Sequence, residues 1–130
     1  MRKHILQIAI LYVVLITALS LINLSGGEPL QDSMGDVTIV DKIIHLFLYF
    51  VFNFLMLMLF AAKFSVTRLP TMLLVSLGVV AFGVGIEFLQ PYVGRECSLY
   101  DGIANALGVV IALIVFRLPA VSRKIMGVRF

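Results

Sequence analysis

The sequence predicts an all-α fold, a polytopic membrane protein built as a bundle of four transmembrane helices with both termini in the cytoplasm. The chain of 130 residues is 62% hydrophobic and only 13% charged, and water-soluble domains do not have such a composition. The apolar residues gather into four runs without the polar and apolar alternation of membrane β-strands. Most Lys and Arg residues lie beside the ends of these runs.

The four runs predict helices at roughly residues 5–24, 42–62, 71–90 and 101–118. Each is close to the ~20 residues that cross a ~30 Å hydrocarbon core at 1.5 Å per residue. We therefore expect one membrane domain over residues 1–130. The first run also has features of a signal peptide, since Arg2 and Lys3 precede it. Its apolar core is longer than the usual 7–15 residues, which favours a retained helix.

The distribution of cations indicates the orientation of the bundle. If the N-terminus is cytoplasmic, eight of the ten Lys and Arg residues lie on the inner side and only Lys42 and Arg95 on the outer side. The eight are Arg2, Lys3, Lys63, Arg68, Arg117, Arg123, Lys124 and Arg129. The positive-inside rule therefore places both termini in the cytoplasm. The net charge of +3 is interpreted as topology anchoring beside anionic lipid, and no nucleic-acid partner is expected.

Polar residues gather at the outer ends of three predicted helices. Residues four apart share a helix face, and three such stripes occur: Asp41, His45 and Tyr49; Ser76, Gly83, Glu87 and Gln90; Asp101, Asn105, Gly108 and Ala112. His45, Glu87 and Asn105 each lie about one turn, ~5 Å, inside the same interface. The inner halves of the second and fourth runs offer only Asn53. Ionisable groups in a bilayer turn inward and pair with one another or with a ligand.

These positions predict a ligand-binding site facing the outer leaflet. Pro91 and Gly94 break the third helix, so the following loop can bring Arg95 back over Glu87, where its planar fork suits an anionic headgroup. The expected ligand-binding residues are Asp41, His45, Glu87, Gln90, Arg95, Ser98, Asp101 and Asn105. The single cysteine and the one well-placed histidine are a poor metal set, so neither a metal nor a cofactor is expected.

Structural roles for the same residues stay open. Asp41 precedes an apolar run and fits a helix N-cap, while the segment from Ser98 to Asp101 fits a capping box. An ion pair between Glu87 and Arg95 would also staple the bundle.

Three sequence blocks carry a resemblance to a known family. They are DKIIHLFLYF from Asp41, IEFLQ from Ile86 and GRECSLYDGIANALG from Gly94. Together they resemble the VanZ-like family of small integral membrane proteins of bacteria, over about residues 5–118. Gly102 and Ala112 depart from the family pattern, which more often has a bulkier apolar residue and a second glycine there.

The resemblance implies a multi-pass protein of the bacterial cytoplasmic (inner) membrane. Its signature residues would be Asp41, Lys42, His45, Glu87, Gln90, Arg95, Ser98, Asp101 and Asn105. The name-giving member of the family is associated with resistance to the glycopeptide antibiotic teicoplanin, so a link to antibiotic resistance in the cell envelope is an expectation here.

Three classes of function fit these observations. The favoured one is a non-catalytic site for a lipid-linked or anionic headgroup, with membrane lipids or a cell-envelope precursor as partner. A second is a structural or assembly partner of a larger envelope complex. The third is an intramembrane hydrolase or transferase, in which His45 is the general base, Asp41 or Asp101 orients it, and Arg95 stabilises the oxyanion. The chain has no HExxH, GxSxG or phosphate-loop motif, which disfavours the enzyme.

Overall fold

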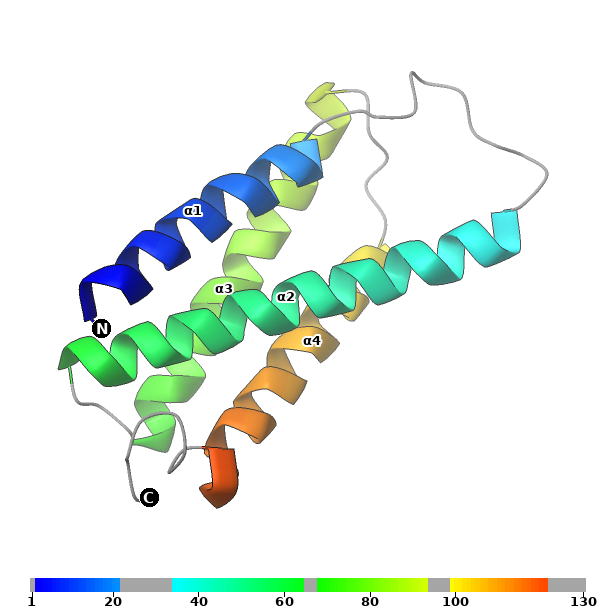
Figure 1. The fold of residues 1–130 in the computed structure, drawn as a ribbon. Coiled ribbons are helices and arrows are strands. Elements are labelled where there is room, and N and C mark those ends of the chain that lie inside the picture. The colour runs from blue at the N-terminus through cyan, green and yellow to red at the C-terminus, as the bar shows by residue number, and fades with distance from the viewer. Residues whose placement is uncertain (1, 22–33, 65–67, 94–98, 122–130) are drawn as a thin grey trace.

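The computed structural model describes residues 2–21, 34–64, 68–93 and 99–121. These residues form α1 (Arg2–Leu21), α2 (Met34–Phe64), α3 (Leu69–Leu89), the short 3₁₀ helix η2 (Gln90–Val93) and α4 (Leu99–Arg117) (Figure 1). No strand occurs in these four segments. The prediction of an all-α fold is therefore confirmed for the described part of the chain.

All four α-helices begin earlier than the apolar runs suggest, by two or three residues in α1, α3 and α4 and by eight in α2. α1 begins at Arg2, and α2 begins at Met34, eight residues before the expected start at 42. Asp41 consequently lies inside α2, so the interpretation of Asp41 as the N-cap of this helix is wrong. Hydrophobicity marks where a helix meets an apolar environment, whereas backbone hydrogen bonding continues into the polar residues that precede it.

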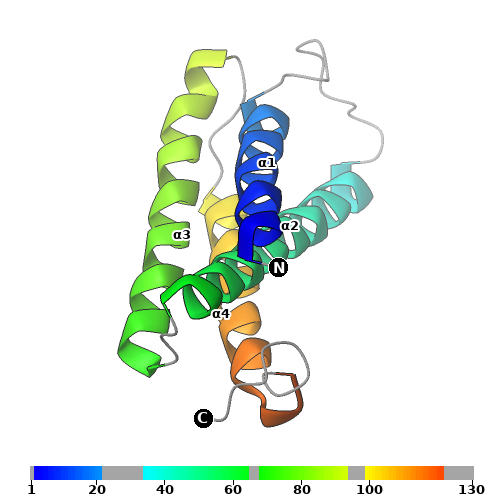
Figure 2. The same ribbon diagram turned by 60° about the vertical axis from the view of Figure 1, so that its left-hand side comes forward.

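The helices alternate in direction, so their ends gather in two groups. α1 begins, α2 ends, α3 begins and α4 ends at one end of the molecule, as two views show (Figures 1 and 2). We call this the basic end, because Lys63, Arg68 and Arg117 lie there. The other end, which includes His45 of α2 and the last turn of α3, is called the polar end.

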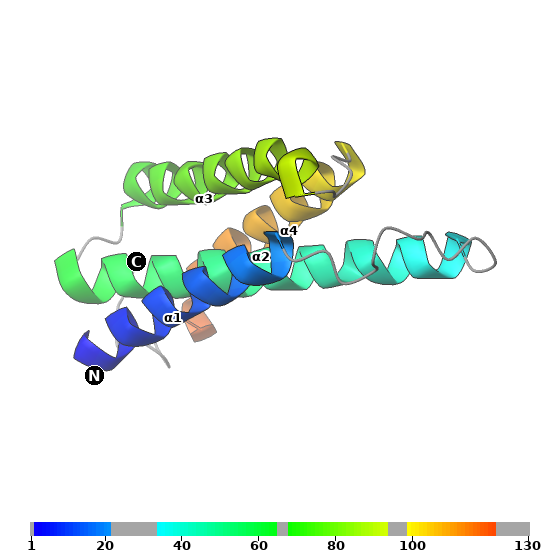
Figure 3. The same cartoon turned by 90° about the horizontal axis from the view of Figure 1, so that it is seen from above.

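α2 and α4 pack against each other more extensively than any other pair of described helices. On α4 the residues Ala104, Gly108, Ala112 and Phe116 are buried at intervals of four. A Cβ atom on Gly108 would collide with the carbonyl oxygen of Leu46 on α2. Small residues four apart let helix backbones approach closely, and packing along such ridges gives an oblique crossing angle, which is visible from above (Figure 3).

Two clusters of buried apolar side chains lie along the bundle. The first contains Ile16, Tyr49, Phe52, Val79 and Val109, and therefore joins all four α-helices. The second contains Leu57, Ala61, Met72 and Phe116, and it joins α2, α3 and α4 near the basic end. The core thus continues below the polar residues at the polar end.

The outward faces of the helices are also apolar. Two helical stretches, Lys42–Lys63 and Leu69–Leu89, are long and apolar enough to cross a membrane, and only 28% of the residues in the most apolar 18-residue window of each are buried. His4–Leu19 and Gly102–Arg117 are shorter apolar helical stretches. Leu11, Leu74 and Phe88 are each about 70% exposed. Such continuous apolar surface is typical of a face that contacts lipid or a partner rather than water.

α1 is held to α2 by a hydrogen bond that supplies a direct test of its docking. The Tyr12 hydroxyl donates to the carbonyl oxygen of Leu48 at 2.7 Å, and the Tyr12 ring lies 6.1 Å from that of Phe52. We expect Tyr12→Phe to cost about 0.6 kcal/mol and at most about 1.7 kcal/mol, which are the average and the maximum for side-chain hydrogen bonds between helices in a membrane protein. Hydrogen exchange of the α1 amides should be faster in the variant than in the wild type, while exchange in α2 and α4 stays the same. Unchanged exchange in α1 would contradict the prediction.

Candidate functional site

The first element of the site is a buried hydrogen bond between α2 and α4. Nδ1 of His45 lies 3.2 Å from Oδ1 of Asn105, and the two residues are only 8% and 5% exposed. With the amide oxygen facing the ring, Nδ1 carries the shared hydrogen. The contact of Gly108 with Leu46 is next to His45 on α2 and one turn from Asn105 on α4. The close backbone approach therefore places the imidazole and the amide within bonding distance.

Glu87 joins the site from α3. A Cβ atom on Gly102 would lie 3.0 Å from Oε1 and 3.2 Å from Oε2 of Glu87, and Oε1 is buried. The carboxylate thus occupies the space that a side chain at residue 102 would fill. Gly102 lies one turn before Asn105 on α4, so the carboxylate and the His45–Asn105 pair meet adjacent turns of the same helix.

Tyr49 lies directly beneath these groups. It is 2% exposed, and its ring packs on Gly83 of α3, where an added Cβ would come within 2.9 Å of Cε1. Tyr49 follows His45 by one turn of α2, and Gly83 precedes Glu87 by one turn of α3. Tyr49 is also a member of the first apolar cluster, so its ring connects the polar end to the apolar core.

Asn53 connects three helices at the midpoint of the apolar stretch of α2. Its Nδ2 donates to Oγ of Ser76 at 3.0 Å and to the carbonyl oxygen of Val109 at 2.9 Å. The side chain is fully buried, and its Oδ1 has no hydrogen-bond partner among the described residues. Together His45, Glu87, Asn105, Tyr49, Asn53 and Ser76 form a polar column from the polar end to the middle of the bundle.

The structure brings together the three expected site residues whose side chains it describes, His45, Glu87 and Asn105. The structure describes only the backbone of three further expected residues, which are Asp41 in α2, Gln90 in η2 and Asp101 in α4. Arg95 and Ser98 lie outside the described residues altogether. The placement of Arg95 over Glu87 and the capping role of Ser98 therefore stay predictions.

Residues that the sequence interpretation left without a role also belong to this region. Tyr49 and Asn53 continue the spacing of four residues that begins with Asp41 and His45, and this periodicity is the signal that identifies them. Gly102, a departure from the family pattern, provides the seat of the Glu87 carboxylate.

The described cluster combines an imidazole, a carboxylate and an amide, which together supply both donors and acceptors of hydrogen bonds. Across the described ranges, no three His, Cys, Asp or Glu residues are placed to hold a metal ion.

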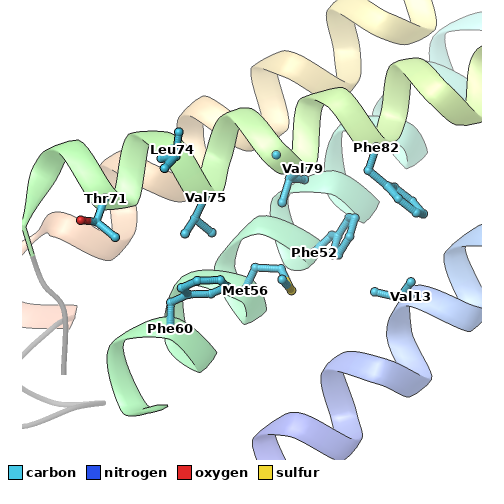
Figure 4. A pocket seen from close by; sticks show the side chains of 10 residues that line it. Val13, Phe52, Met56, Phe60, Thr71, Leu74, Val75, Val79 and Phe82 are labelled. Carbon is cyan, nitrogen blue, oxygen red and sulfur yellow. The ribbon is translucent and has the colours of Figure 1, made fainter. Parts of the chain in front are cut away.

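A separate cavity of about 470 Å³ lies among α1, α2 and α3, toward the basic end (Figure 4). It is lined by Val13, Phe52, Met56, Phe60, Thr71, Leu74, Val75, Gly78, Val79 and Phe82. The lining is apolar except for Thr71. The sequence interpretation expected a polar cavity at the polar end and did not anticipate this one.

Comparisons with protein-family models, curated protein sequences and solved structures found no match for the chain. The resemblance to the VanZ-like family therefore depends on the three sequence blocks alone and stays a prediction.

Proposed function

We propose that the chain is a four-span protein of the bacterial cytoplasmic membrane with both termini in the cytoplasm. Its cluster of His45, Glu87 and Asn105 would bind the polar headgroup of a lipid-linked cell-envelope precursor or another anionic envelope lipid. The observation that carries the proposal is the convergence of these three groups, from three helices, on adjacent turns of α4. The VanZ-like resemblance adds the expected link to glycopeptide resistance.

The charge pattern supports this membrane orientation. All seven Asp and Glu residues fall between the first two apolar runs or around the connection from α3 to α4: Glu28, Asp32, Asp36, Asp41, Glu87, Glu96 and Asp101. Eight of the ten Lys and Arg residues belong to the opposite side. The positive-inside rule assigns the basic end to the cytoplasm, so the cluster faces the outer leaflet.

The depth of the cluster supports a headgroup as ligand. His45 and Asn105 follow the outer ends of their apolar stretches by three residues, and Glu87 precedes the end of α3 by two. Polar groups at this depth meet the boundary between headgroups and acyl chains, where an amphiphile presents sugar or phosphate oxygens. Lys42 and Arg95 are the cations in this part of the sequence and would meet the anionic group.

The proposal is tested by altering the Glu87 seat without removing any polar group. In Gly102→Leu the new side chain must displace the carboxylate, which lies 3.0 Å from the position of a Cβ. We expect the purified variant to retain about tenfold less envelope lipid than the wild type, which corresponds to a loss of roughly 1.4 kcal/mol in binding free energy. Lipid mass spectrometry measures the retained lipid. Arg95→Ala and His45→Gln should lower retention in the same direction.

Gly85→Leu is the matched control, because no atom lies within 4 Å of a Cβ at Gly85. It should retain lipid like the wild type. Wild-type retention in Gly102→Leu, Arg95→Ala and His45→Gln together would disprove the headgroup site.

A structural role is the second candidate, and the burial of the His45–Asn105 bond favours it. In that case His45→Gln and Asn105→Leu would lower the melting temperature while lipid retention stays constant. A partner complex that co-purifies equally with the wild type and with these variants would support an assembly function.

A further inference from the structure

The apolar cavity lies mainly between α2 and α3, with Val13 of α1 completing its lining. Phe52, Met56 and Phe60 line it from α2 at intervals of four residues, and Val75 and Val79 of α3 point toward them across the gap (Figure 4). Gly78 belongs to the α3 wall, and no atom lies within 4 Å of the position of its Cβ. Gly78 is exposed, so a side chain added there would enter open space at the edge of the cavity.

The length of the cavity corresponds to one leaflet. Its α3 wall extends from Thr71 to Phe82, and the eleven residue-to-residue steps between them rise about 16 Å at 1.5 Å each. This is about half of a ~30 Å hydrocarbon core. The cavity begins near the basic end and stops near the middle of the bundle, so its natural occupant is a single hydrocarbon chain from the leaflet at the basic end.

Cations flank the cavity at that end. Lys63 follows Phe60 by three residues on α2, Arg68 precedes Thr71 by three residues, and both cations are exposed. No Asp or Glu occurs among the described residues of the basic end. A hydrophobic cavity with basic residues at its mouth is complementary to a lipid that has an anionic headgroup.

We propose that this cavity holds an acyl chain of an anionic phospholipid of the cytoplasmic leaflet, with its phosphate against Lys63 and Arg68. The site rests on the membrane orientation of the proposed function but shares no residue with the headgroup cluster. It lies in the opposite leaflet and would hold a structural or regulatory lipid.

The test uses the full-length protein purified in detergent, with phosphatidylglycerol or phosphatidylcholine of identical acyl chains added. Native mass spectrometry counts the bound lipids. We expect the wild type to bind phosphatidylglycerol at least tenfold more tightly than phosphatidylcholine. Gly78→Phe should fill the cavity and abolish the binding of both lipids, while Gly85→Phe, on the same helix but outside the cavity, should bind like the wild type.

The charges are tested separately. A Lys63→Gln/Arg68→Gln double variant should bind the two lipids with similar affinity, whereas Lys42→Gln, at the polar end, should keep the preference for phosphatidylglycerol. Melting curves that match the wild type would show that Gly78→Phe and the double variant fold. If Gly78→Phe does not fold, Gly78→Leu provides a smaller blocking side chain.

Three results would overturn the proposal: equal binding of both lipids by the wild type, unchanged binding in folded Gly78→Phe or Gly78→Leu, or an unchanged preference in the double variant. The two lipid sites fail independently. Gly102→Leu should leave phosphatidylglycerol binding intact, whereas Gly78→Phe should leave envelope lipid retention intact.

Discussion

Replacing Gly108 with valine is expected to disrupt the bundle. The added Cβ would collide with the backbone carbonyl oxygen of Leu46 and lie 3.0 Å from the backbone nitrogen of Phe50. Backbone atoms cannot rotate away as a flexible side chain can, so α2 and α4 must separate. Overpacking a core commonly costs about 1–3 kcal/mol, and we expect Gly108→Val to be at or above the upper limit. Thermal unfolding in detergent, followed by circular dichroism, measures the loss.

Gly85→Val is the control for the loss of glycine itself, because a Cβ at Gly85 meets no atom within 4 Å. Its melting temperature should stay close to that of the wild type. If Gly108→Val has the same melting temperature as Gly85→Val, α2 and α4 do not contact each other at this point. The same displacement should break the His45–Asn105 bond one turn away, so Gly108→Val should also lose lipid retention.

Asn53→Asp is expected to be the other strongly destabilising substitution. It places a carboxylate at the midpoint of the apolar stretch of α2 and removes the amide that donates to Ser76 and to the carbonyl of Val109. Under the proposed topology this carboxylate lies at the centre of a membrane span, where an acidic residue costs about 2.5–3.5 kcal/mol. Denaturation in a graded mixture of mild and harsh detergents would report the loss as a lower unfolding midpoint.

Asn53→Leu separates the charge from the lost hydrogen bonds. Leucine has a similar size and no polar atom, so the variant loses two hydrogen bonds but also removes the buried Oδ1 that has no partner within the described residues. Removing one partner of a buried hydrogen bond costs about 1–3 kcal/mol when the other partner is left unsatisfied, but the carbonyl of Val109 lies within α4 and the loss of the unpartnered Oδ1 offsets part of this cost. We therefore expect a change of about 1 kcal/mol or less, and a loss equal to that of Asn53→Asp would contradict the argument.

The sequence predicts the helical class well because hydrophobic run length reports the helices directly. The intervals of four residues also identify the buried faces: His45 and Tyr49 on α2, and Asn105, Gly108 and Ala112 on α4, all lie inside the bundle. The early start of α2 at Met34 escapes the prediction, because the residues from 34 to 41 are not part of an apolar run.

The partners across helices could not be predicted from the sequence. Periodicity gives the face of each helix, but the rotation and crossing angle of two helices decide which residues meet. The depth of Glu87 in the bundle can therefore be predicted from the sequence, whereas the contact of its carboxylate with Gly102 cannot. The same holds for Asn53 with Ser76. The cavity beside Gly78 escaped prediction for a related reason, since a gap between helices has no residue type of its own.

The partnership of α2 with α4 has a consequence for biogenesis. α4 is the last helix to be synthesised, and 53 residues separate the end of α2 at Phe64 from the end of α4 at Arg117. At about 5–20 residues per second, α2 waits roughly 3–10 s before the ribosome has delivered its main neighbour. Under the proposed topology, the imidazole of His45 and the amide of Asn53 pass that interval against lipid, the insertion machinery or a chaperone. Under the same topology, we expect truncated chains that end before residue 99 to be degraded faster than the full-length chain, because α2 then lacks its main neighbour.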